Sequence, residues 1–160
     1  MNKILSFALT VILGGCTLDL GLPISKSESV LASTSTAEVL EVEATGEANN
    51  YTFAVTVKSP DTGCDRYADW WEVITPEGEL LYRRVLLHSH VDEQPFTRTG
   101  GTVEIAPTQP VIVRVHMSDS GYSPIARQGS VENGFTEVTL PADFAMSLAD
   151  SEPLANNCAF

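Results

Sequence analysis

Residues 63–99 read GCDRYADWWEVITPEGELLYRRVLLHSHVDEQPFTRT, and this stretch decides the fold. Two arms rich in apolar residues, 66–74 and 79–88, lie on either side of the sequence TPEG. Proline presets φ in a turn and glycine tolerates positive φ, so TPEG predicts a tight turn. The stretch therefore predicts a β-hairpin. The adjacent Trp70 and Trp71 must point to opposite faces of its first strand, so at least one of them belongs to a core.

Alternating apolar and polar residues predict further strands on both sides of this hairpin. Residues 51–57 alternate strictly, as expected of a strand with one buried face. Residues 111–117 (VIVRVHM) give the clearest alternation, with the three valines at odd positions and the methionine predicted to face inward. The other predicted strands are 38–44, 102–106, 129–133 and 135–140, with turns at 46–50 and 75–78, a break at Gly100-Gly101 and a helical turn within 142–149.

This count of short strands predicts the fold class. Six to eight strands with turn signals every eight to twelve residues are typical of two packed sheets. The sequence therefore predicts an all-β domain, an antiparallel β-sandwich of the immunoglobulin or fibronectin type. A length of 160 residues with 43% hydrophobic residues fits one globular domain.

The charge of the chain excludes one class of partner. The 21 acidic residues outnumber the 9 basic ones, which gives a formal net charge of −12. Nucleic-acid binding depends on basic patches, so we expect no nucleic-acid partner. Adsorption to anionic lipid by charge alone is disfavoured for the same reason.

The N-terminus has the pattern of a signal peptide. Lys3 precedes ten largely apolar residues, 4–13, which are too few for a membrane-spanning helix of about 20 residues. The segment ends in Leu13-Gly14-Gly15-Cys16, which resembles the lipobox of bacterial lipoproteins. In that family the cysteine is acylated and becomes the mature N-terminus. The alternative is an ordinary secretory signal in which the cysteine is incidental.

The lipobox resemblance implies a membrane partner and a domain organisation. Residues 1–15 would be the signal peptide, and acyl chains on Cys16 would anchor the protein to a membrane. Residues 16–37 are rich in serine and threonine and have no sustained period, which predicts a flexible tether. The sandwich domain would occupy residues 38–160. The expected location is the cell envelope, facing the periplasm or the extracellular side.

The cysteine count predicts one disulfide. If Cys16 carries lipid, Cys64 and Cys158 remain, an even number in an oxidising compartment. A Cys64–Cys158 bridge would hold the C-terminal tail beside the first strand of the central hairpin. The alternative, in a reducing setting, is two free thiols.

The three histidines are candidate metal ligands. His88 and His90 lie two residues apart, so on a strand both imidazoles share a face and can reach one copper or zinc ion. His116 would complete the site if its strand joins the same sheet, and Asp92 and Glu93 follow in the loop. The structural alternative is that His88 and His90 hydrogen-bond the loop 91–99 and hold it against the sheet.

A row of polar residues forms a second candidate site. Glu72, Arg84 and Arg114 are predicted on the outer face of the sheet, where arginines bind carboxylate or phosphate groups well. The alternative is that these arginines pair with neighbouring acids and only cover the sheet. Arg83 and Arg84 point to opposite faces, so one of the two is expected to be partly buried and paired.

Residues 63–98, together with VIVRVHMSDSGY at 111–122, resemble a group of uncharacterised bacterial lipoproteins and secreted proteins. That resemblance implies a domain but no activity. No nucleophile elbow, redox CxxC, phosphate-binding loop or HExxH motif is present. We therefore expect a non-catalytic binding or envelope-associated module without a cofactor, whose partner is an envelope protein or a small ligand. The rival hypotheses are metal binding or delivery, and an enzyme with an unrecognised polar site on the sheet.

Overall fold

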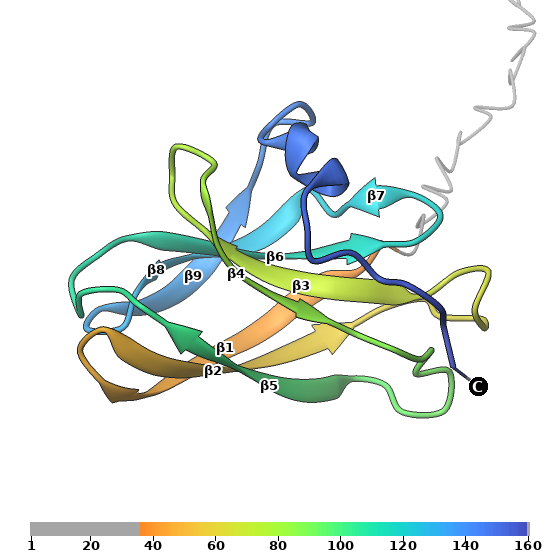
Figure 1. The fold of residues 1–160 in the computed structure, drawn as a ribbon, viewed down its shortest axis with the longest axis horizontal. Helices are drawn as coiled ribbons and strands as arrows, with labels where there is room; N and C mark the ends of the chain where they lie inside the picture. Colours follow the sequence, from red (N-terminus) through yellow and green to blue (C-terminus); the bar gives the residue numbers. More distant parts are fainter. Residues whose placement is uncertain (1–35, 160) are drawn as a thin grey trace, which may run out of the picture. The chain divides into compact units, whose positions relative to one another are not determined.

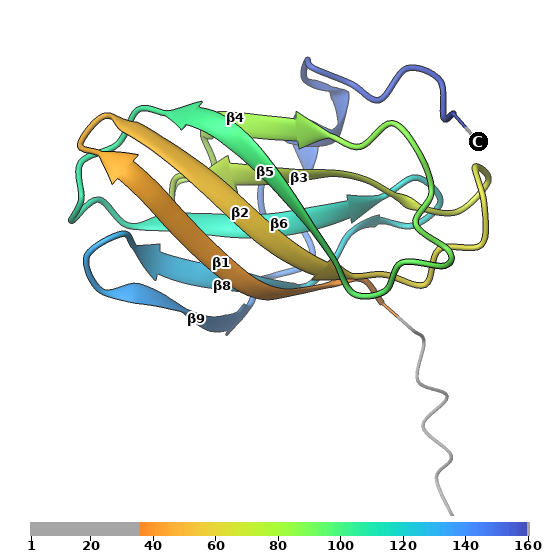
Figure 2. The ribbon, with the colours of Figure 1, turned by 90° about the horizontal axis from the view of Figure 1, so that it is seen from below.

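The computed structural model describes residues 36–159, which form two antiparallel β-sheets packed against each other (Figures 1 and 2). The smaller sheet has the order β1–β2–β5, and the larger has the order β4–β3–β6–β8–β9 with β7 paired to β6. The predicted all-β sandwich is confirmed. The proposed signal peptide, Cys16 and nearly all of the proposed tether lie outside the described residues.

The elements of the small sheet are β1 (Glu38–Glu47), β2 (Asn50–Lys58) and β5 (Phe96–Val103). Those of the large sheet are β3 (Ala68–Ile74), β4 (Leu80–Val85), β6 (Val111–Met117), β7 (Gly121–Tyr122), β8 (Ile125–Ser130) and β9 (Gly134–Thr139). Residues 36–159 contain nine strands, one more than the predicted maximum, because the two-residue β7 was not among the predicted strands. A short 3₁₀ helix, η1 (Met146–Asp150), follows β9.

The chain passes between the two sheets in the same order as in immunoglobulin-type sandwiches. The chain leaves β2 for the other sheet, forms the β3–β4 hairpin there, and returns so that β5 pairs with β2. Strand β3 then takes β6 as its second neighbour. In immunoglobulin domains the second and fifth strands are likewise neighbours in one sheet, and the third and sixth strands are neighbours in the other.

Local patterns predicted some boundaries and missed others. Strand β6 has the predicted bounds, and the turn after β3 closes with the Gly78 N–H donating to the Thr75 carbonyl at 2.9 Å. Strand β5 was predicted wrongly as 102–106, because Gly100-Gly101 reads as a break although both glycines lie within the strand. The strand predicted at 129–133 is also wrong in its bounds, since β8 spans Ile125–Ser130.

The main core lies between the two sheets. Trp71 and Phe53 are fully buried there, together with the inward-facing valines of β2, β3 and β6. The prediction that at least one tryptophan belongs to a core is confirmed, and Trp70 is also buried on the opposite face.

A second, smaller core lies on the outer face of the large sheet. Its buried members are Ile74, Ile112, Ala126 and Leu140, with Phe144 and Leu148 packed against them. Residues 141–159, here called the C-terminal segment, run across this face in dark blue in Figure 1. Strand β6 is therefore buried along both faces, although its even-numbered residues were predicted to point to solvent.

The pairing register brings several loops to one end of the sandwich. Glu38 pairs with Lys58 and Val57 pairs with Phe96, so β1 and β5 both begin where β2 ends. The β2–β3 loop (59–67) and the β4–β5 loop (86–95) consequently share this end, which is at the right of Figure 2. We call it the loop pole. No helix within residues 36–159 is long and apolar enough to cross a membrane.

Candidate functional site

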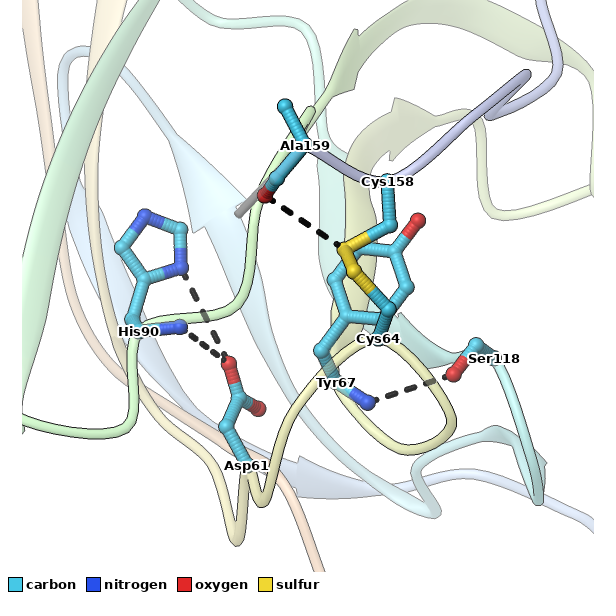
Figure 3. Close-up of a disulfide and its surroundings, with 7 residues drawn as sticks. All are labelled: Asp61, Cys64, Tyr67, His90, Ser118, Cys158 and Ala159. Carbon is cyan, nitrogen blue, oxygen red and sulfur yellow. Dashed lines mark hydrogen bonds and ion pairs between the residues drawn. A yellow bond between two sulfur atoms is a disulfide. The ribbon is translucent and has the colours of Figure 1, made fainter.

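The loop pole is held together by the predicted disulfide. Cys64 in the β2–β3 loop and Cys158 near the C-terminus are bonded, with their Cα atoms 5.5 Å apart (Figure 3). The prediction of this bridge is confirmed. Next to it, the Ala159 N–H donates to the Leu87 carbonyl at 2.6 Å, and His88 and Ala159 form an isolated parallel bridge. The end of the chain is thus attached to both long loops of the loop pole.

Asp61 connects the two loops from within. Its carboxylate accepts hydrogen bonds from the backbone N–H groups of Ala68 at 2.9 Å and His90 at 2.8 Å. Gln94 adds a second connection, because its side-chain amide accepts from the Ser59 N–H and donates to the His90 carbonyl. The main chain of His90 is therefore fixed on both sides, by a carboxylate and by an amide.

The imidazole of His90 has different surroundings from its main chain. The ring stacks on Phe96, with ring centroids 3.7 Å apart, and only 1% of the side chain is exposed. Neither ring nitrogen has a hydrogen-bond partner within residues 36–159, although Nδ1 lies 3.8 Å from the Asp61 carboxylate. Burial, with a contribution from the Arg98 charge, lowers the pKa of His90 to about 4. The ring is therefore neutral at pH 7.

His88 lies beside this ring and is exposed. The centroids of the two imidazoles are 4.4 Å apart and their planes are inclined by 40°. A cavity of about 230 Å³ is lined by the six consecutive residues 88–93, including the carboxylates of Asp92 and Glu93. A smaller cavity of about 130 Å³ lies on the side of Leu86 and Arg98. The His88–His90 pair thus borders two openings at the loop pole.

His116 belongs to another cluster. Its Nδ1 lies 2.7 Å from Asp69, and its ring stacks on Trp70 with centroids 3.8 Å apart and meets Tyr122 edge to face. Within residues 36–159, no three side chains of His, Cys, Asp or Glu are grouped so that they could hold one metal ion. The structure therefore does not assemble the three-histidine site that the sequence suggested. His116 is used by its own carboxylate and aromatic neighbours.

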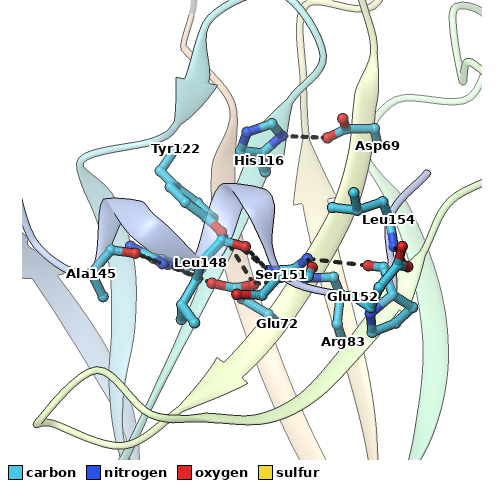
Figure 4. Close-up of polar contacts among 12 residues, drawn as sticks. Asp69, Glu72, Arg83, His116, Tyr122, Ala145, Leu148, Ser151, Glu152 and Leu154 are labelled. Atoms are coloured by element: carbon cyan, nitrogen blue, oxygen red, sulfur yellow. Dashed lines mark hydrogen bonds and ion pairs between the residues drawn. The ribbon is translucent and has the colours of Figure 1, made fainter.

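The predicted polar row is a buried ion cluster (Figure 4). Arg114 belongs to it as predicted, but the arginine contributed by β4 is Arg83 and not Arg84. Glu72 pairs in register with Arg83 on β4 and with Arg114 on β6. Its carboxylate accepts from Arg83 at 2.6 and 2.9 Å and from Arg114 at 2.8 Å, and all three side chains are at most 1% exposed. Arg84 points to the other face and is exposed. The expectation that one of the two adjacent arginines is buried and paired is confirmed.

The C-terminal segment supplies the remaining acceptors of this cluster. Arg83 donates to the carbonyls of Leu148, Ser151 and Pro153, and Arg114 donates to those of Phe144 and Ala145. The Arg114 guanidinium also lies 3.4 Å from the centre of the Tyr122 ring. Burial, together with the Glu72 charge, raises the pKa of Tyr122 to about 12. The cluster binds the chain's own backbone, so it does not present the open arginine face that a ligand would need.

Three contributors to these sites were missed in the sequence: Asp61, Gln94 and the C-terminal segment. Asp61 binds the backbone of His90, 29 residues away, and Gln94 binds the backbone of Ser59, 35 residues away. Both lie in loops whose composition predicts only turns. The one available signal was Cys158, since a bridge to Cys64 requires the tail to cross the molecule.

One comparison relates this chain to a known protein. A protein of Halomicrobium mukohataei named "Putative lipoprotein" is 42% identical to this chain over 97 residues, which is 58% of this chain. The chain spans about half, 47%, of the length of that relative. No family model matches the sequence. No solved structure matches it either.

Proposed function

We propose that this chain is a lipid-anchored protein of the cell envelope whose β-sandwich acts as a non-catalytic binding module outside the cytoplasm. The observation that carries the proposal is Leu13-Gly14-Gly15-Cys16 at the end of a ten-residue apolar segment. The lipoprotein name of the relative from Halomicrobium mukohataei supports it independently. The disulfide supports an oxidising compartment, since such bridges persist there.

The position of the first strand shows where the proposed tether joins the domain. Strand β1 begins at the loop pole, where Glu38 pairs with Lys58 at the end of β2. An acylated Cys16 would lie 22 residues before Glu38, so the proposed tether would enter the domain at the loop pole.

The chemistry of the large sheet argues against a ligand or substrate site at the centre of its outer face. The charged groups at the centre of its outer face, Glu72, Arg83 and Arg114, are satisfied by one another and by backbone carbonyls. Charged groups that are already paired and buried stabilise a fold, but their hydrogen bonds are used and they cannot bind a substrate as well. The proposed binding surface is therefore the loop pole, where side chains from separate loops converge.

Acylation is tested by expressing the full chain with an alkyne fatty acid and measuring incorporation at Cys16. We expect label and detergent-phase partitioning for the wild type and loss of both for Cys16→Ser. Cys158→Ser is the matched control, because it removes a cysteine that lies in the disulfide and leaves the proposed acylation site intact. Equal labelling of wild type and Cys16→Ser would contradict the anchor.

The binding role is tested with photo-crosslinking side chains at exposed apolar positions of the full-length protein in native envelopes. Leu87 and Val91, at the loop pole, are 56% and 46% exposed, and Met146 in η1 is 44% exposed. We expect one reproducible adduct from the loop-pole positions and none from Met146. Adducts of equal yield from all three positions would argue against a specific surface.

A further inference from the structure

The anomaly of the loop pole is the buried imidazole of His90. A buried polar side chain almost always has a hydrogen-bond partner, because leaving one without a partner is unfavourable. His90 has two ring nitrogens in this condition, within a side chain that is 1% exposed. Its main chain is meanwhile held by Asp61 and Gln94, so the position of the ring is fixed. Such a group is a ligand-binding candidate.

We propose that His88 and His90 form a two-imidazole site for a divalent transition-metal ion, with Cu²⁺ as the tightest ligand. The two rings come from the same short loop and their centroids are 4.4 Å apart. His90 is buried and fixed, whereas the exposed His88 ring hydrogen-bonds to no residue among 36–159, so it can rotate to meet an ion. Imidazole nitrogen suits copper, zinc and nickel, and the affinity of a given site peaks at Cu²⁺.

Asp61 lies beside one nitrogen of the His90 ring. Its Oδ2 is 3.8 Å from Nδ1, which is too far for a hydrogen bond, but its negative charge favours the tautomer with the proton on Nδ1 and leaves the Nε2 lone pair for the ion. Asp61 also accepts from the His90 N–H, so it fixes the backbone of the site.

The surroundings of the pair suit a cation. Asp92 and Glu93 line the cavity of about 230 Å³ beside the two histidines. Glu93 is bound by Arg98 through two hydrogen bonds of 2.7 and 3.1 Å, so Asp92 is the carboxylate that remains available. Only two imidazoles come from the protein, and the other coordination positions would be filled by water or by a ligand of a partner. The coordination positions left open would lie on the side of the exposed His88, since the His90 ring is buried.

The test is calorimetric titration of the full chain in detergent with CuCl₂ and ZnCl₂, using Cys16→Ser so that no thiol outside the disulfide competes. We expect one Cu²⁺ per chain, weaker binding of Zn²⁺, and a loss of about tenfold or more in Cu²⁺ affinity for His88→Gln and for His90→Gln. His116→Gln is the matched control, because it removes the only other histidine of the chain and should leave the affinity unchanged.

Electron paramagnetic resonance of the Cu²⁺ complex gives an independent readout. Superhyperfine splitting from two imidazole nitrogens is expected for the wild type and from one for His88→Gln. If His90→Gln fails to fold, the exposed His88→Gln alone decides the question. Heat no larger than the buffer blank, unchanged binding in His88→Gln, or equal losses in His116→Gln and His88→Gln would each overturn the proposal.

Discussion

The two adjacent arginines of β4 offer a matched test of how the C-terminal segment is held. Arg83 is buried and donates to Glu72 and to the carbonyls of Leu148, Ser151 and Pro153. Arg84 is exposed on the same strand. Arg83→Ala and Arg84→Ala remove the same atoms and the same charge, so any difference between them reports the buried contacts.

The expected loss follows from what Arg83→Ala leaves behind. Removing one partner of a buried ion pair costs about 3–5 kcal/mol. Here Glu72 keeps Arg114 as a partner, and the remaining pair is neutral. The loss therefore arises mainly from the Ser151 and Pro153 carbonyls, which lose Arg83 as their donor. The Leu148 carbonyl and the Glu72 carboxylate keep the Ser151 N–H and the Tyr122 hydroxyl as donors. We therefore expect the lower end, about 3 kcal/mol, whereas Arg84→Ala should change stability by less than about 0.5 kcal/mol.

Urea and thermal unfolding followed by circular dichroism measure this difference. For a domain of this size, 3 kcal/mol corresponds to a fall in Tm of roughly 10 °C. Arg83→Lys should lie between wild type and Arg83→Ala, because it restores the charge without the planar fork of donors. If Arg83→Ala and Arg84→Ala unfold within about 0.5 kcal/mol of each other, the buried cluster does not stabilise the segment and this interpretation is refuted.

Two further predictions concern the loop pole. Cys158→Ser should lower the free energy of unfolding by about 4 kcal/mol in the chain-entropy model, since the bridge spans 94 positions of sequence, and reductant should produce the same shift in the urea midpoint of the wild type; a wild type insensitive to reductant would contradict it. Because the pKa of His90 is about 4 in the folded chain and 6.5 in the unfolded chain, the unfolded state binds more protons between these values. Stability should therefore fall by about 3 kcal/mol in total as the pH drops from 6.5 to 4, with no further loss from this residue below that range. In His90→Gln this part of the pH dependence should be missing, and an identical pH profile for the two proteins would count against the neutral buried ring.

Short-range patterns were reliable where one segment carries all the information. The strict alternation of 111–117 predicted β6 with its observed bounds, and TPEG predicted the β3–β4 turn. The cysteine pairing followed from an even count of two. Each of these conclusions needs only the local periodicity of a strand, the residues of a turn or the number of cysteines.

Long-range contacts account for the errors. Gly100-Gly101 reads as a chain break, yet pairing with β2 keeps both glycines in a strand. Strand β4 has apolar residues at both odd and even positions, so its alternation did not reveal that Arg83, and not Arg84, faces Glu72. The pairing register with β3 made that choice.

Patterns in the sequence predicted the β-sandwich class, the central hairpin and the disulfide partners correctly. Which charged groups remain free depends on tertiary contacts. The C-terminal segment crosses the outer face of the large sheet and buries Glu72 with Arg83 and Arg114, so the polar row takes the paired alternative and is closed to a ligand. The fold also places His116 beside Asp69, in a different cluster from the pair of His88 and His90. Alternation within a strand states which face a side chain takes, but what covers that face depends on residues far away in the chain.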